Sequence, residues 1–499
     1  MKKILFFAFS IIAAAVNAQL KLAKIFTDNM LLQQQQSIPV WGKGIPGNPV
    51  QIIFGKEKRQ TIVGNDSSWH AYLTKRNASA TATSLFIYSG IEKVIIKNIL
   101  IGDVWLCIGQ SNMEFPMVRE LHYKDEIKNS IQPLIRFYNP SYAGKNIFGV
   151  SYPDSIVQLL NTNDFYKGEW QNCDSASFKN MSAVAYFFGK NIIEKTTIPI
   201  GLINLSIGGA PLETFIDVDA LKNDARFADK VKGDWIENKA LPVWVRERGK
   251  QNVSARQNIP TDTNGKNHAY KPGFAFTAGI ATLVNIPIKG IICYQGESNA
   301  QEIERVNEYQ KLCALMVSDY RKKWKQPLLP FYYVQLSSID TAKYKSALWP
   351  QFRDEQRKMM NIISNSGMAV CSDIGAKDDV HPTNKKDVGE RLAKWALNKT
   401  YGINSIPSGP LPLSAKYVNG KIIVSFQYAE GLKAADQKLL KGFSTDGKTD
   451  VAAIVVDKKI VVAVKEKPSY IYYAWKPFTE ANLVNAASLP ASSFQLKVQ

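Results

Sequence analysis

The sequence has few of the residues that bind metals or form disulfides. Among 499 residues there are four histidines and five cysteines, and no two cysteines form a CxxC motif. A dedicated zinc site draws on clustered histidine and cysteine ligands, and none cluster here, so we expect no metal. An oxidising compartment would allow one disulfide, but the sequence does not select the pair.

Long apolar runs are almost absent. The main one, residues 4–16, is too short to cross a bilayer. It follows Lys2 and Lys3 and ends in Val16-Asn17-Ala18, which predicts a secretory signal peptide (residues 1–18) cleaved near Ala18–Gln19. We therefore expect a periplasmic or secreted protein with no membrane span.

The charge is strongly basic, with 62 lysines and arginines against 43 acids and a formal net charge of +19. The basic residues are interspersed with acids, and the densest groups, residues 56–59 and 321–325, are short. No motif pairs a basic patch with base-stacking aromatics. This pattern favours general solubility over a polyanion, so we expect no nucleic-acid partner. The oligomeric state is not indicated.

The pattern of apolar runs predicts three folded parts. Residues 19–96 show short strand-like runs between turns, the last at 94–96, and predict a β-sandwich module. Residues 97–405 alternate buried strands with helices, which is typical of a three-layer α/β domain, with a polar insertion at 217–275. Residues 406–499 revert to β structure, with hairpin turns at Asn419-Gly420 and Asp457-Lys458. The expected buried strands are 104–108, 198–205, 288–294, 329–334 and 367–371, and the expected helices are 183–194, 301–325, 350–365 and 383–399.

The sharpest local motif is Gly109-Gln110-Ser111-Asn112-Met113, directly after the expected strand 104–108. Ligands of open α/β sheets bind at the carboxyl ends of the strands. Ser111 at this point can present a hydroxyl and a backbone N–H to one carbonyl, or it can merely cap the following helix. The motif is not the GxSxG of α/β-hydrolases, because Met113 replaces the final glycine.

A serine nucleophile needs a base, and His381 is the best placed of the four histidines. It lies in Lys377-Asp378-Asp379-Val380-His381-Pro382, between an expected strand and an expected helix. Asp378 and Asp379 can orient the imidazole. His70, His122 and His268 lie in the β module, a charged stretch and the polar insertion, where we expect no catalytic role.

Two more turns follow strands of the same domain. Ser206–Ala210 contains Gly208 and Gly209, and residues 295–299 read Gln-Gly-Glu-Ser-Asn. Each can aim an N–H or a side-chain amide at a developing oxyanion. Each could equally be a structural strand-to-helix turn, but four such turns at the same edge of one sheet favour an ester-hydrolysing site.

Together these motifs resemble the SGNH hydrolases, and within them the sialate O-acetylesterase-like carbohydrate esterases. The resemblance covers residues 20–499 in order. It rests on residues 101–105 with 109–113, 208–213, 294–300, 352–356, 379–382 and 489–494.

The resemblance implies a flavodoxin-like SGNH core with Ser111 as nucleophile and His381 as general base, and no cofactor. It implies an oxyanion hole built from the Ser111 N–H, a glycine N–H from Gly208 or Gly209, and the Gln295 amide, with Asn299 as the alternative. The acid stays open: the Asp-x-x-His spacing favours Asp378, many sialate-type members align Asp379, and some use a Ser–His dyad.

The substrate implied is an O-acetylated sugar or glycan, most directly sialic acid. An arginine would suit the carboxylate of sialic acid, and Arg353 and Arg119 are the candidates, with Glu297 as a further substrate-binding residue. Cys293 departs from the family, which usually has tryptophan there. The alternatives are an esterase for acetylated xylan or another polysaccharide, and a carbohydrate-binding protein whose esterase centre has decayed. The intact Ser111, His381 and Gln295 set argues against decay.

Overall fold

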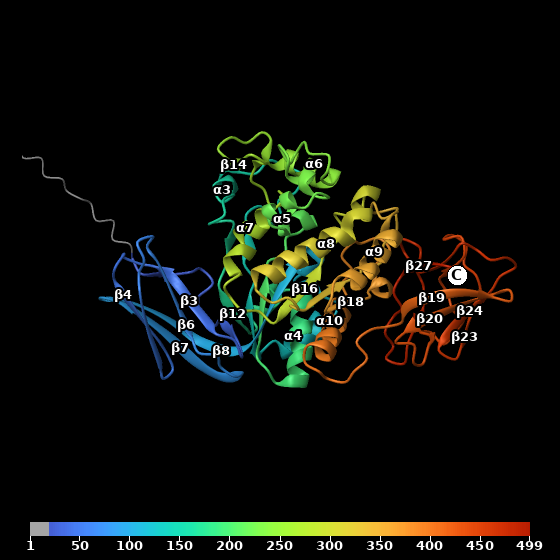
Figure 1. The fold of residues 1–499 in the computed structure, drawn as a ribbon, viewed down its shortest axis with the longest axis horizontal. Coiled ribbons are helices and arrows are strands. Elements are labelled where there is room, and N and C mark those ends of the chain that lie inside the picture. Colours follow the sequence, from blue (N-terminus) through green and yellow to red (C-terminus); the bar gives the residue numbers. More distant parts are fainter. Residues whose placement is uncertain (1–18) are drawn as a thin grey trace, which may run out of the picture.

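The computed structural model describes residues 19–499. The predicted signal peptide lies outside this part. Figure 1 shows the N-terminal strands at one end, an α/β part in the middle and the C-terminal strands at the other end. Within residues 19–499, no helix has both the length and the apolar character needed to cross a bilayer.

The N-terminal part forms two sets of antiparallel strands. Their alternating buried and exposed side chains reflect sheets with one face on a core. One set joins β1 (Lys21–Leu22), β3 (Ile38–Lys43) and β6 (Ser68–Leu73), and the other joins β4 (Pro49–Phe54), β5 (Glu57–Ile62) and β7 (Ser79–Ser89).

One strand, β8 (Glu92–Gly109), belongs to both the N-terminal and the central sheet (Figure 1). Its first half pairs antiparallel with β7, and its second half pairs in parallel with β13 (Ile200–Asn204) and β16 (Gly290–Tyr294). The register to β7 shifts near Asn98, which has a positive φ of 57° and donates its amide to Asn29 and Asn172. The expected strands 94–96 and 104–108 are therefore one strand, which runs through the expected boundary at residue 96.

The central sheet has the order β12-β9-β13-β8-β16-β17-β18, and all strands except β12 are parallel. The five strands from β13 to β18 follow the order 2-1-3-4-5 in the chain, which is one of the two common doubly wound orders. β9 was not expected from the sequence. The strands are β9 (Gln132–Tyr138), β12 (Trp170–Cys173), β13 (Ile200–Asn204), β16 (Gly290–Tyr294), β17 (Phe331–Val334) and β18 (Ser366–Ala369).

Four long helices lie where the periodicity predicted them. α4 (Ala183–Thr196) packs on β13 and on α10 (Lys386–Lys399), and α8 (Ile303–Lys323) packs on α9 (Trp349–Ile362). The apolar face predicted for α10 is buried, as Val388, Leu392 and Trp395 show. The polar insertion contains α5 (Val218–Asn223), α6 (Val243–Val253), and the hairpin of β14 (Thr261–Asp262) and β15 (Gly265–Lys266).

The C-terminal part has its own apolar cluster, whereas the N-terminal and central parts share one. Both predicted hairpins are confirmed. Asn419 and Gly420, with φ of 45° and 74°, join β19 (Leu411–Val418) to β20 (Lys421–Gln427). Asp457, with φ of 54°, lies in the turn between β23 (Ala453–Val456) and β24 (Lys459–Ala463).

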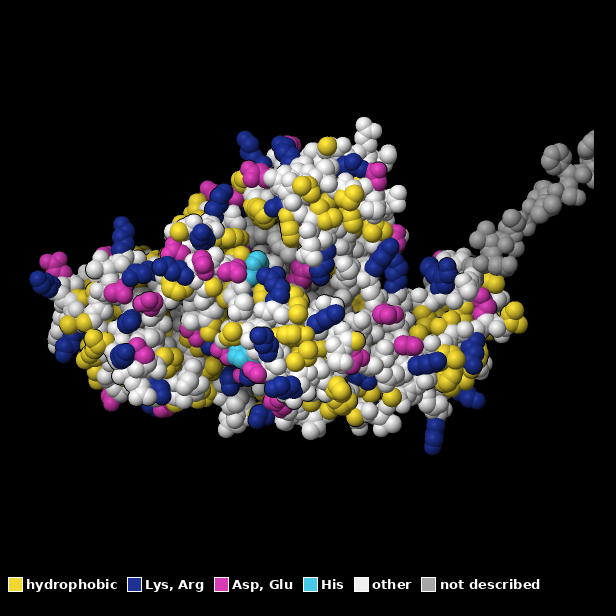
Figure 2. Space-filling model, turned by 180° about the vertical axis from the view of Figure 1, so that it is seen from behind, with side chains coloured by type: hydrophobic (Ala, Val, Ile, Leu, Met, Phe, Trp, Pro, Cys, Tyr) yellow, Lys and Arg dark blue, Asp and Glu magenta, His cyan; other side chains and the backbone are white. Residues whose placement is uncertain are grey.

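The cysteines and the charged side chains relate to two expectations from the sequence, a possible disulfide and the interspersed charges. All five cysteines, which lie in the described part of the chain, are buried and unpaired. Figure 2 shows basic and acidic side chains interspersed over one face of the molecule. This pattern matches the scattered charges of the sequence.

The end of β8 tolerates only glycine. Gly109 has a φ of +137°, and a Cβ there would lie 2.0 Å from the Tyr294 carbonyl oxygen on the paired strand β16. We expect Gly109→Ala to lower the free energy of unfolding by roughly 2–6 kcal/mol, combining backbone strain with overpacking. Urea unfolding followed by circular dichroism measures this loss.

Gly90→Ala is the control. Gly90 also has a left-handed φ (+59°), but its added Cβ would meet nothing within 4 Å. It should lose only the roughly 1–2 kcal/mol of the left-handed conformation. Equal losses in the two variants would contradict the steric role of Gly109.

Candidate active site

Ser111 stands at the carboxyl end of the central strand. β8 ends at Gly109, and the short helix α1 (Ser111–Glu114) begins at the serine. The first N–H groups of a helix have no partner within it, so the Ser111 N–H is available to a ligand. Ser111 therefore presents both a hydroxyl and an N–H at this edge of the sheet.

His381 meets Ser111 across 270 residues of chain. Its Nε2 lies 2.8 Å from the Ser111 Oγ, which is hydrogen-bond distance. The histidine is in the loop between β18 and α10. Partial burial lowers its pKa, so the imidazole is neutral near pH 7 and can accept a proton. The structure thus brings together the predicted nucleophile and base.

The carboxylate beside the imidazole is Asp379. Its Oδ1 lies 3.5 Å from His381 Nδ1 and accepts the His381 backbone N–H at 2.8 Å. Within residues 19–499, no hydrogen bond or ion pair joins Asp378 to His381. The preference for Asp378 by spacing is corrected accordingly, because the turn that contains the backbone hydrogen bond directs Asp379 toward the ring.

Asn112 holds the nucleophile turn against the histidine loop. Its Nδ2 donates to the Val380 carbonyl at 3.0 Å and to Glu297 Oε1, and its Oδ1 accepts from Lys385 Nζ at 2.6 Å. Asn112 follows Ser111 directly and Val380 precedes His381 directly. One buried amide therefore sets the distance between nucleophile and base.

The two charged partners of Asn112 are fully buried. Burial raises the pKa of the Glu297 carboxyl to about 7 and lowers the pKa of the Lys385 ammonium to about 7. The Lys385 charge opposes the rise in the pKa of Glu297, and the Glu297 charge opposes the fall in the pKa of Lys385. Lys385 also lies over the rings of Phe115 and Tyr294. Sequence reasoning missed Lys385, because a lysine in a loop is normally a surface residue.

Gly208 is the glycine of the second turn that faces the nucleophile. A Cβ on Gly208 would lie 3.8 Å from the Ser111 Cβ, whereas one on Gly209 would meet Tyr270 and Trp244. The Gly208 N–H donates to the Tyr142 hydroxyl at 3.0 Å, and its carbonyl accepts from Tyr270 at 2.7 Å. The Gly208 peptide is thereby held in one orientation beside Ser111.

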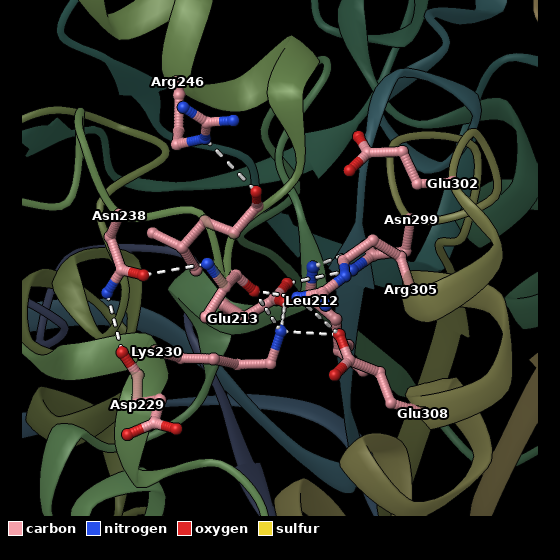
Figure 3. A network of polar contacts seen from close by, with 12 residues as sticks. Leu212, Glu213, Asp229, Lys230, Asn238, Arg246, Asn299, Glu302, Arg305 and Glu308 are labelled. Atoms are coloured by element: carbon pink, nitrogen blue, oxygen red, sulfur yellow. Dashed lines mark hydrogen bonds and ion pairs between the residues drawn. The ribbon is translucent and has the colours of Figure 1, made fainter.

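The amides of Gln295 and Asn299 lie in a buried network rather than in the cleft. Gln295 Nε2 donates to Asn299 Oδ1 at 2.8 Å and also contacts the Ala210 carbonyl and Gln110. Asn299 donates to Glu213, which pairs with Lys230 at 2.8 Å (Figure 3). Both amides thus have acceptors of their own. The described residues that line the cleft do not include either of them, so the geometry does not support the expected donor role.

The network in Figure 3 ties the insertion to the core. The Lys230 side chain is 2% exposed, and its ammonium contacts both Glu213 and Glu308 of α8, the latter at 2.6 Å. Although burial opposes ionisation, the Lys230 charge lowers the pKa of Glu213. A buried charge is stable only when it is paired, so this contact anchors the base of the insertion.

A cleft of about 870 Å³ lies over Ser111 and His381. Its size is typical of a small-molecule site. Sequence reasoning missed much of its wall, because the insertion contributes Trp244 and Arg248 from a stretch that looked merely polar. Their i, i+4 spacing on α6 is the one signal that could have revealed them. The remaining wall includes Phe148, Tyr270, Ser298, Gln301, Lys343, Tyr344, Lys345 and Leu348.

The three predicted substrate-binding residues do not line this cleft. Arg353 is fully buried and donates to the carbonyls of Ala474 and Lys476, so it ties α9 to the C-terminal part. Glu297 is buried against Asn112. Arg119 is exposed and lies over the Phe115 ring. The expected substrate contacts of Arg353 and Glu297 are therefore corrected. Arg353 already bonds two backbone carbonyls and Glu297 already bonds the Asn112 amide, so both occupy structural positions.

Comparison with known proteins relates this chain to carbohydrate esterases. Residues 266–398 match a family model described as carbohydrate esterase, sialic acid-specific acetylesterase. The human sialate O-acetylesterase is 25% identical over 448 residues, which cover 83% of this chain and 77% of that protein. The mouse sialate O-acetylesterase is also 25% identical, over 83% of this chain and 80% of that protein. The crystal structure of a carbohydrate acetylesterase from Xanthomonas citri matches with a TM-score of 0.78, 25% identity, and coverage of 96% of this chain and 99% of that one.

A Ser–His pair at the end of a central strand, in a chain with these relatives, defines a carboxylic ester hydrolase. The fold is a mixed α/β fold similar to that of a carbohydrate acetylesterase. The resemblance drawn from the motifs is confirmed: the chain is similar to sialate O-acetylesterases and to a carbohydrate acetylesterase of known structure.

The Asn112 bridge gives a test of positioning. Asn112→Ala should lower kcat by about 100-fold with little change in KM, because a small displacement of the base is enough for such a loss. The labelling rate of Ser111 by a fluorophosphonate, which depends on the Ser–His hydrogen bond, should fall in parallel.

Ser182→Ala is the matched control. Ser182 donates to the Met113 carbonyl at 2.6 Å and caps α4, so it anchors the same turn without touching the histidine loop. It should cost roughly 1 kcal/mol of stability and leave kcat within a few-fold. Similar kinetic losses in both variants would show that Asn112 contributes only stability.

Proposed function

We propose that this chain is a serine esterase that removes O-acetyl groups from carbohydrates, with O-acetylated sialic acid as the substrate. The observation that carries the proposal is the 2.8 Å contact between Ser111 Oγ and His381 Nε2 on the floor of a sugar-sized cleft. The printed names of the curated relatives and of the matching family model support the choice of sialic acid.

In the proposed mechanism Ser111 Oγ attacks the acetyl carbonyl carbon while His381 Nε2 takes the hydroxyl proton. The tetrahedral intermediate collapses, the sugar oxygen leaves, and His381 returns the proton to it. Water, deprotonated by His381, then attacks the acetyl–Ser111 ester; the ester bond breaks, His381 returns the proton to Ser111 Oγ, and acetate leaves. No metal or organic cofactor takes part in these steps.

The proposed oxyanion donors are the N–H groups of Ser111 and Gly208. The Gly208 N–H would exchange the Tyr142 hydroxyl for the oxyanion, a stronger acceptor because it is charged. A Cβ on Gly209 would meet Tyr270 and Trp244 instead of Ser111. Gln295 and Asn299 would act indirectly, by fixing Gln110 and residues 210–213 around the nucleophile.

Asp379 is the proposed orienting acid. It is the carboxylate in contact with His381 Nδ1, but at 3.5 Å and with its side chain 52% exposed the contact is loose. We therefore propose a weaker acid contribution than that of a buried triad carboxylate.

Three finer features belong to the same proposal. The strand order 2-1-3-4-5 supports a flavodoxin-like, three-layer SGNH core. The proposed domains are residues 19–96, 97–405 and 406–499, with β8 shared by the first two. Export to the periplasm or the exterior is supported by the leader-like residues 1–18.

Ser111→Ala should lower the rate of acetate release from O-acetylated sialic acid by about 10³-fold or more, because this hydroxyl forms the covalent bond. The thermal midpoint should stay close to that of the native chain. Acetylated xylo-oligosaccharides serve as the competing substrate. If Ser111→Ala keeps more than a few per cent of the native activity, the serine mechanism is wrong. If the native enzyme turns over the xylo-oligosaccharides faster than O-acetylated sialic acid, the proposed substrate is wrong.

The pH profile distinguishes the acids. Neutral His381 is the active form, so kcat/KM should rise with pH and level off above the pKa of His381, which burial lowers from its ordinary value. The Asp379 charge raises this pKa, so Asp379→Asn should move the acid limb to lower pH and reduce kcat by about 10–100-fold.

Asp378→Asn is the control, since it removes one charge from the same loop. It should change kcat less than about twofold and leave the acid limb in place. The reverse ranking would transfer the role to Asp378, and small effects in both variants would indicate a Ser–His dyad.

A further inference from the structure

The cleft over Ser111 has a basic wall. Arg248 on α6 and Lys343 and Lys345 in the loop before α9 line it together with the catalytic pair. Glu247 is the acidic side chain among the described lining residues. The ligand of this cleft therefore meets more positive than negative charge.

Arg248 is held in place without a counterion. Its guanidinium carbon lies 4.6 Å from the centre of the Trp244 ring and 5.4 Å from that of Phe148. Stacking on two aromatic faces fixes the plane of the guanidinium group. Within residues 19–499, no ion pair or hydrogen bond is made by Arg248, and its Nε and Nη1 are buried without an acceptor.

The titratable neighbours of Arg248 do not supply an anion. Burial raises the pKa values of Tyr152 and Tyr270, and the nearby Arg248 charge reduces this rise only in part. Burial, followed by the Arg248 charge, lowers the pKa of His268 to about 3. All three side chains are neutral near pH 7, so none of them is a counterion for Arg248.

The Arg248 side chain lines the cleft and has N–H donors without an acceptor, and a guanidinium group suits a carboxylate, which can accept two parallel hydrogen bonds. Unpaired buried donors are costly, and a ligand carboxylate would remove this cost. A neutral sugar offers hydroxyl groups but no such charge. The arrangement therefore favours an acidic ligand over a neutral one of the same size.

We propose that Arg248 binds the carboxylate of an acidic acetylated sugar and thereby selects sialic acid over neutral sugars. This inference rests on the proposed esterase function. Trp244 and Phe148 act as positioning residues that hold the guanidinium plane.

The test compares three substrates on the full chain: O-acetylated sialic acid, the methyl ester of its carboxyl group, and p-nitrophenyl acetate. The methyl ester is the same sugar without the charge, and p-nitrophenyl acetate reports the esterase centre alone. We expect the native enzyme to favour the free acid over its methyl ester. In Arg248→Gln the kcat/KM for the free acid relative to p-nitrophenyl acetate should fall about 10–100-fold, mainly through KM, and the preference over the methyl ester should disappear.

Two further variants complete the test. Arg248→Lys keeps the charge but not the planar fork, so it should restore part of the preference and guards against a folding failure of the glutamine variant. Arg246→Gln removes a positive charge from the same helix, where Arg246 bonds the Leu241 carbonyl rather than the cleft, and it should keep the native ratio.

Arg248→Gln with an undiminished preference for the free acid would overturn the role of Arg248 while the esterase function stands. If the native enzyme hydrolyses p-nitrophenyl acetate but favours the methyl ester or acetylated xylo-oligosaccharides, the acidic-sugar proposal is wrong. Failure to hydrolyse any of these esters would overturn the proposed function itself.

Discussion

The geometry of the catalytic site depends on one buried amide. Asn112 joins the turn after β8 to the loop before α10, segments that are distant in the chain and supported by different strands. Both hydrogen-bonding ends of the amide are used, and its partners are a carbonyl and two buried charges. These groups have little access to water, so their hydrogen bonds form only when the Ser111 turn and the His381 loop keep their relative positions.

A second network of buried polar contacts supports the turns around Ser111. Lys230, Glu213 and Asn299 link the insertion, the Gly208 turn and the turn after β16 through buried polar contacts. The glycine turns that surround Ser111 are therefore held mainly by side chains below the cleft. Gln295 and Asn299 lie in the expected loop, but their amides bond within this network and do not line the cleft.

Local patterns in the sequence predicted the long helices, the buried strands and both C-terminal hairpins, because apolar periodicity and turn residues are local properties. They also led to Ser111 and His381, since chemistry collects at the carboxyl ends of parallel strands. The spacing favoured Asp378, whereas the structure brings Asp379 to the imidazole, because these two carboxylates differ only in the direction of one turn. The burial of Arg353, Glu297 and Lys385, and the cleft position of Arg248, depend on tertiary contacts that spacing does not encode.

The strand β8 carries a consequence for how this fold can vary. Since it forms the edge of the N-terminal sheet at one end and the support of Ser111 at the other, the N-terminal part cannot be exchanged as an independent cassette. A junction at residue 96 would divide a continuous strand four residues before its partner β2 (Leu31–Gln33) begins to pair at Leu100. The C-terminal part has a separate apolar cluster. Recombination among related chains would therefore be tolerated more readily at the second junction, near residue 406, than at the first.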